Sequence, residues 1–123
     1  MTENYGKMRL YTSTGTRQSI QRLRELDVGL LMVNVWRNPD NWVRFAVDNG
    51  CFSAYNQGEE WNAGPFLSIL NRLVREHRTP DWIVIPDKPT DPQSLEFSKA
   101  WLPVLERMYP SFPLYLAVQD GMT

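Results

Sequence analysis

Five short apolar runs lie along the chain, separated by polar segments. Three of them are dense in β-branched and aromatic residues and show no clean alternation with polar residues, which is typical of strands buried on both faces. The runs predict strands over residues 7–11, 30–35, 43–47, 82–86 and 113–118.

Three segments between these runs have apolar positions at helical spacing. Residues 18–26 place Ile20, Leu23 and Leu26 on one side, and residues 63–77 have a longer apolar stripe of the same kind. The third predicted helix begins at an Asp91 cap, with Pro92 at the first helical position, and runs to about residue 108. Pro103 lies inside that segment and is expected to kink or weaken the helix.

The resulting order is β-α-β-β-α-β-α-β within a single domain over residues 1–123. Strands that alternate with helices predict an α/β fold with a mainly parallel five-stranded sheet and right-handed crossovers. The link over residues 36–42 is too short for a helical crossover. It requires either a compact irregular crossing or an antiparallel pair.

Composition narrows the class of protein. Hydrophobic residues make up 42% and charged residues 22%, with a formal net charge of −1, so a strongly basic coat for nucleic acid is excluded. The single cysteine, Cys51, excludes an internal disulfide and a cysteine-rich zinc site. No run approaches the roughly 18 apolar residues of a membrane span, and the first ten residues are too polar for a signal peptide. We therefore expect a cytoplasmic protein without a membrane partner.

Polar residues follow every predicted strand. In parallel α/β folds the carboxyl ends of the strands form the ligand-binding edge, because the loops converge there. Asp48 and Asp87 directly follow apolar strand residues, and such carboxylates can accept from an N–H and an exocyclic amine together or exchange a proton. The alternative is that both are turn residues, in Asp48-Asn49-Gly50 and in Pro86-Asp87-Lys88-Pro89.

Three strand ends resemble those of the tRNA-guanine (queuine) transglycosylases, and more closely the short phage and bacterial relatives linked to 7-deazapurine modification of DNA. The segment FAVDNGCFS at 45–53 is similar to the family's Asp-Ser-Gly-Gly-Phe strand end. The segment VIPD at 84–87 lies where the family has its second active-site aspartate, and LAVQDG at 116–121 resembles its Val-Gln-Gly-Gly strand end. The resemblance covers about two thirds of the chain and implies the N-terminal half of a TIM (β/α)8 barrel.

The resemblance also implies roles for individual residues. Asp48 would be the catalytic acid/base carboxylate, and Asp87 would accept from the N–H and amino groups of guanine or a 7-deazaguanine. Gln119 would donate to the ring carbonyl, and Gly121 would let the backbone approach the base. The implied substrate-binding residues are Asp87, Gln119, Asn49, Gly121 and Phe52. The implied partner is such a base in tRNA or DNA.

An aromatic side chain must stack on that base, and the candidates are Tyr11, Trp36 and Phe52. Trp61 and Trp101 are instead expected to pack in the core or in a groove.

The chain also departs from the family. The family's covalent nucleophile is a further aspartate on a later strand, followed by a zinc site, and this sequence offers only the isolated Cys51 and His77 as ligands. We expect no cofactor and no metal site. Half a barrel would leave two open edges. The chain is therefore expected to be a piece of a longer or split enzyme, to pair with itself or a partner chain, or to be an open sheet without the chemistry.

Two functions fit these residues. One is base exchange on guanine or 7-deazaguanine, by an enzyme or a part of one. The other is a non-catalytic binding or interaction module that retains the fold. A third option is a small-molecule hydrolase that uses Asp48 and Asp87 as a carboxylate pair, with magnesium or manganese as the suitable metal.

Overall fold

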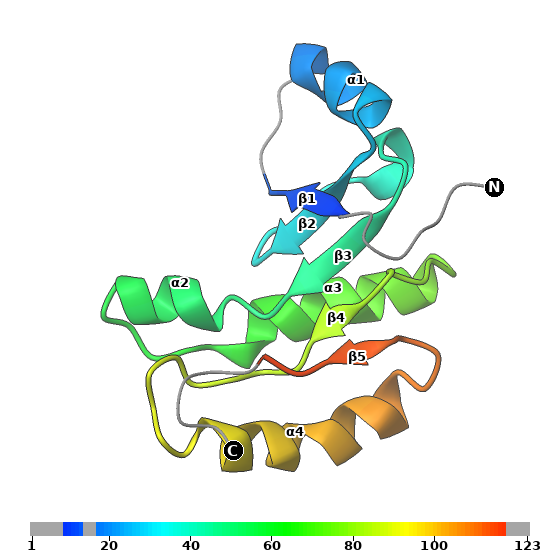
Figure 1. Cartoon of the computed structure of the whole chain (residues 1–123). Helices are drawn as coiled ribbons and strands as arrows, with labels where there is room; N and C mark the ends of the chain where they lie inside the picture. Colours follow the sequence, from blue (N-terminus) through cyan, green and yellow to red (C-terminus); the bar gives the residue numbers. More distant parts are fainter. Residues whose placement is uncertain (1–8, 14–16, 118–123) are drawn as a thin grey trace, which may run out of the picture.

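The five strands form one sheet in which every pair is parallel and the strands follow in chain order (Figure 1). The structure, a computed structural model, describes residues 9–13 and 17–117. The strands are β1 (Leu10–Thr12), β2 (Val28–Val33), β3 (Phe45–Asp48), β4 (Ile83–Val84) and β5 (Leu114–Tyr115). The predicted α/β fold is confirmed, and the sheet is parallel throughout.

Four α-helices and one 3-10 helix connect the described strands. They are α1 (Arg17–Glu25), the 3-10 helix Pro39–Asn41, α2 (Cys51–Asn56), α3 (Ala63–Arg75) and α4 (Ser94–Met108). Three of the α-helices match predicted segments, whereas no helix was predicted over the six residues of α2. Among the described residues, no helix combines the length and the apolar character needed to cross a membrane.

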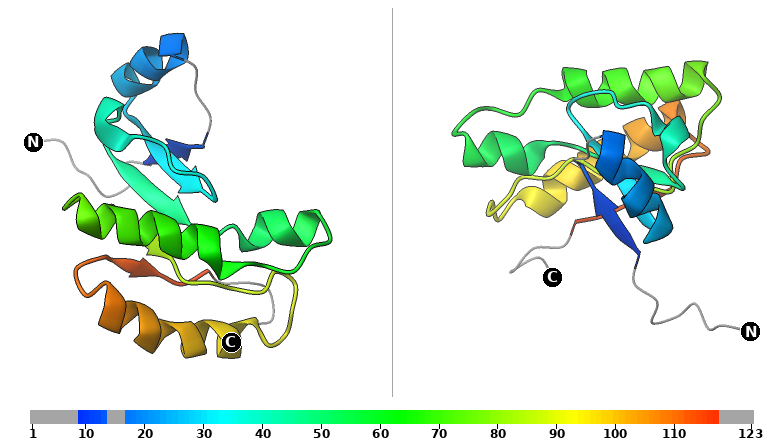
Figure 2. Two further views of the ribbon diagram at one scale, coloured as in Figure 1. Left: turned by 180° about the vertical axis from the view of Figure 1, so that it is seen from behind. Right: turned by 90° about the horizontal axis from the view of Figure 1, so that it is seen from above.

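The hydrophobic core lies between one face of the sheet and the helices α3 and α4. Figure 2 shows α3 covering this face. Alternate strand residues face the helices because successive side chains on a strand point to opposite sides. The fully buried members from the sheet include Leu30, Met32, Val47 and Ile83.

The other face of the sheet is lined by the strand residues that point away from the core, and it carries no helix in Figure 1. The Tyr11 ring meets Trp82 edge-on, with the ring centroids 5.2 Å apart, and Trp82 stacks on Tyr115 at 5.4 Å. The Tyr11 ring lies over Gly29 of β2, and a Cβ on Gly29 would lie 2.7 Å from that ring. Because β2 and β3 lie between β1 and β4, these contacts indicate that the open face is concave.

The connection between β2 and β3 is a compact parallel crossing. The 3-10 helix Pro39–Asn41 shortens the path, and its Asn38 cap accepts from the Asp40 backbone N–H at 2.9 Å. Leu30 then pairs with Phe45 in a parallel register. Of the two alternatives for residues 36–42, the structure has the irregular crossing.

Several predicted boundaries were wrong for local reasons. β2 ends at Val33 because Asn34 adopts a φ of 63° and the Val35 N–H turns back to the Val33 carbonyl at 2.7 Å. Asp91 does not cap α4: its carboxylate accepts from the Gln93 N–H at 2.8 Å in the turn before the helix. α4 begins at Ser94 and continues through Pro103 to Met108.

Candidate functional site

Asp48 ends β3 on the open face of the sheet. Its neighbour Val47 is in the core, so strand alternation places Asp48 on the side away from α3 and α4. The side chain is half-buried and accepts from the Asn49 backbone N–H at 2.8 Å. Burial raises the pKa of Asp48 above its ordinary value, the Asn49 N–H opposes this, and the negative charge of Asp87 raises the pKa further. Asp48 therefore holds a proton more readily than a solvent-exposed aspartate does.

Asn49 joins the ends of two strands through its side chain. Its amide nitrogen donates to the Ile85 carbonyl at 3.0 Å and to the Asp87 Oδ1 at 2.9 Å. Its amide oxygen accepts from the Cys51 backbone N–H at 2.8 Å. Asn49 is only 3% exposed, so these bonds form away from water. The side chain thus fixes Asp87 beside the end of β3, and a direct contact of Asn49 with a base stays a prediction.

Gly50 makes the tight turn from β3 into α2. Its φ of 81° is left-handed, which favours glycine, and a Cβ here would collide with the Asn34 side chain. The turn brings α2 directly to the carboxyl end of the sheet.

Phe52 lies on α2 with 60% of its surface exposed. Its ring is 6.3 Å from that of Tyr55, and an exposed ring of this kind can stack on a flat ligand. The other two stacking candidates, Tyr11 and Trp36, are less exposed and contact charged groups. The Tyr11 hydroxyl donates to Asp81 at 2.7 Å, and the Arg72 guanidinium lies 4.1 Å from the centre of the Trp36 ring. Phe52 is therefore the candidate whose ring is most open.

Asp87 lies in the loop between β4 and α4, where its carboxylate accepts from Asn49 and lines a neighbouring cavity. The structure places Asp87 close enough to Asp48 for their charges to interact. Gln119 and Gly121, the remaining predicted base contacts, lie outside the described residues. Contact of Asp48, Asp87 and Phe52 with a base stays a prediction.

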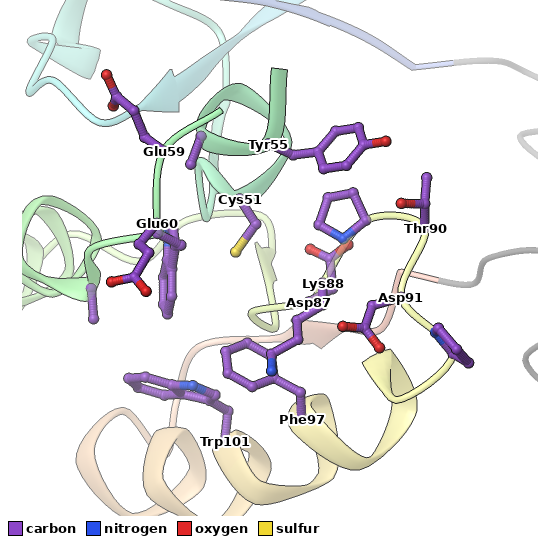
Figure 3. A pocket seen from close by; sticks show the side chains of 15 residues that line it. Cys51, Tyr55, Glu59, Glu60, Asp87, Lys88, Thr90, Asp91, Phe97 and Trp101 are labelled. Carbon is purple, nitrogen blue, oxygen red and sulfur yellow. The ribbon is translucent and has the colours of Figure 1, made fainter. Parts of the chain in front are cut away.

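A cavity of about 780 Å³ lies beside these residues, between α2, the loop before α3, the loop after β4, and α4 (Figure 3). Trp61, Phe97 and Trp101 form its aromatic wall, and Asp87 reaches it. The Trp61 indole N–H donates to the Asn49 carbonyl at 2.8 Å. Asp48 and Phe52 are not among the cavity residues. Trp61 and Trp101 were expected to pack in the core or in a groove, and they line this cavity.

Cys51 also lines the cavity, but its chemistry argues against a nucleophile. The residue is 2% exposed, and burial raises the pKa of the thiol to about 12. The thiol therefore stays protonated at neutral pH, whereas the thiolate is the reactive form. His77 is an exposed residue in the turn after α3. Within residues 9–13 and 17–117 no group of three or more His, Cys, Asp or Glu side chains is arranged to hold a metal ion.

Comparison with known proteins adds no relative. No family model, no curated protein and no solved structure matches the chain. The function is therefore argued from the site.

Proposed function

We propose that this protein recognises guanine or a 7-deazaguanine base of a nucleic acid at the open face of the sheet, through Asp48 and Asp87. The observation that carries the proposal is the pair of carboxylates at the ends of the adjacent parallel strands β3 and β4, with Asp87 held by Asn49 at 2.9 Å. Such a pair suits a ligand edge that donates two hydrogen bonds side by side.

Each residue has a distinct role in this proposal. Asp87 accepts from the ring N–H and the exocyclic amine of the base. Asp48, whose pKa is raised by burial, is the group that gives or takes a proton near the base. Phe52 stacks on the base with its exposed ring. A target within a duplex must first leave its stack to reach this face.

The resemblance in the sequence suggests base exchange as the reaction, as in the transglycosylases. Asp48 and Asp87 support the recognition and proton-transfer parts of this proposal. A binding module without turnover would use the same pair, so recognition is the part of the proposal that the geometry supports best.

The first test is calorimetric titration of the protein with 7-cyano-7-deazaguanine. Saturable binding is expected, and Asp87→Asn should abolish it because the amide cannot accept both donors of the base. The control is Glu96→Gln, which neutralises an exposed carboxylate on α4 that is paired with Lys99. Unchanged affinity in Asp87→Asn would remove Asp87 from the site.

A ligand control separates recognition of the amine from general stacking. Hypoxanthine has the ring of guanine but lacks the exocyclic amine. It should bind at least about tenfold more weakly than guanine, since the hydrogen bond from the exocyclic amine to Asp87 is then lost. Equal affinities would mean that the carboxylates do not recognise the amine.

A further inference from the structure

The cavity beside Asp87 combines an aromatic wall with a strongly acidic lining. Trp61 is the centre of the wall: it meets Phe97 edge-on at 6.1 Å between ring centroids and Trp101 at 5.6 Å. The volume of about 780 Å³ is in the range of small-molecule sites. The wall offers both ring faces and apolar surface to a ligand.

The charges around the cavity favour a cation. Four carboxylates and one ammonium line it, the carboxylates being those of Glu59, Glu60, Asp87 and Asp91. Glu59 and Glu60 form no ion pair with any of the described residues. A phosphate or another anion would be repelled from such a site.

The protein itself places an ammonium group against the aromatic wall. The Lys88 Nζ lies 5.0 Å from the centre of the Phe97 ring, a cation–π distance. This contact is independent of the acidic lining. It indicates that the wall accommodates an alkylammonium group.

The acidic side chains come from two different segments. Glu60 belongs to the loop before α3, and Asp91 belongs to the loop before α4. Figure 3 shows them on different sides of the cavity, with Phe97 and Trp101 below the space between them. A ligand that matches this arrangement has cationic groups separated by an apolar chain.

We propose that this cavity binds a linear polyamine, with its ammonium groups at the two acidic segments and its methylenes along Trp61, Phe97 and Trp101. The proposal does not depend on base recognition at the open face. A compact cation would reach only one acidic segment at a time, and a neutral chain would gain nothing from the charges of Glu60 and Asp91.

The test uses spermidine as the probe and the fluorescence of the tryptophans, with calorimetry, as the readout. Spermidine should bind saturably and change the emission, because Trp61 and Trp101 line the site. Glu60→Gln and Asp91→Asn should each weaken binding by about three- to fivefold, and Glu96→Gln outside the cavity should leave it unchanged. Asn at 91 can still accept from the Gln93 N–H, so the turn is retained.

Two comparisons distinguish this site from general attraction to an acidic surface. Cobalt(III) hexammine carries the same charge as spermidine without methylenes, and it should bind at least about tenfold more weakly. Lys88→Met removes the competing ammonium and should tighten spermidine binding. Equal binding of the two trications, or spermidine binding that is identical in Glu60→Gln, Asp91→Asn and the unaltered protein, would overturn the proposal.

Discussion

Asp48 and Asn49 are adjacent in the chain but do different work at the end of β3. Asp48 lies half-buried on the open face, where desolvation and the charge of Asp87 both disfavour its ionised form. Asn49 is buried, and its side chain donates to Asp87 and to the Ile85 carbonyl and accepts from the Cys51 N–H. One residue thus carries the proposed chemistry, and the next holds its partner in place.

Replacing Asp48 by Asn should stabilise the fold at pH 7. The folded protein binds the Asp48 proton more tightly than the unfolded chain, so the stability of the unaltered protein falls as pH rises from the ordinary aspartate pKa through the raised one. Asp48→Asn cannot ionise and should escape this loss, gaining on the order of 1 kcal/mol. The difference in stability between the two proteins should vanish below about pH 3.5, where Asp48 is mostly protonated in the folded protein and in the unfolded chain.

Urea unfolding of both proteins at pH 7 and at about pH 3.5 measures this difference. Glu96→Gln, on an exposed surface, serves as the control and should show no such pH-dependent gain. A variant Asp48→Asn that is less stable than the unaltered protein at pH 7 would mean that the folded site favours the charge.

Replacing Asn49 by Ala should destabilise the fold by about 2 to 3 kcal/mol. The Ile85 carbonyl and the Cys51 N–H would be left unpaired in a buried position, and Asp87 would lose its neutral donor. Asn56→Ala, at the exposed end of α2, is the matched control and should change stability by less than about 0.5 kcal/mol. If urea unfolding shows equal losses of stability for Asn49→Ala and Asn56→Ala, the hydrogen bonds of Asn49 do not hold the strand ends together.

At the scale of elements, α2 is the feature that the sequence analysis missed. Its six residues are too few to establish a helical period. The residue at its N-cap is Gly50, which has no side chain to form a capping hydrogen bond. The available signal was Asn49, whose side chain accepts from the N–H two residues later in an Asx turn. The longer α3 and α4 were predictable because their apolar stripes extend over several turns, whereas the ends of short strands depended on single turns such as that at Asn34.

Gly50→Ala tests the turn that starts α2. The left-handed φ and the collision with Asn34 should together cost about 2 kcal/mol or more. Gly58→Ala has a similar φ of 69° but open space around its Cβ, so it should cost only about 1 kcal/mol. Adding Asn34→Gly should recover part of the Gly50→Ala loss. Equal losses at the two glycines would show that the Asn34 contact is unimportant.

At the scale of the molecule, the sheet has a helix-covered face and an open, concave face. A mainly parallel sheet and the placement of Asp48 and Asp87 after neighbouring strands were predictable, because parallel strands carry their carboxyl ends to the same side. The direction of β3 relative to β2 was left open by the sequence, since the short link allowed either pairing. The cavity was not predictable. It depends on how α4 packs beside the loop at residues 59–61, which is a long-range contact that no local pattern encodes.

The two proposed ligands therefore belong to different surfaces that share Asp87. A base would lie on the open face against Asp48 and Phe52, and a polyamine would lie in the aromatic cavity on the helix side. The resemblance of the sheet to half of a barrel stays a prediction, and the contact of Tyr11 with Trp82 across the open face supports it.

The most direct measurement is a titration of isotope-labelled protein with 7-cyano-7-deazaguanine, followed by amide chemical shifts. We expect saturable shifts centred on Asp48, Phe52 and Asp87, with little change at Glu60 and Trp101. No shifts at ligand saturation, or shifts confined to the aromatic cavity, would contradict recognition of the base by the Asp48–Asp87 pair.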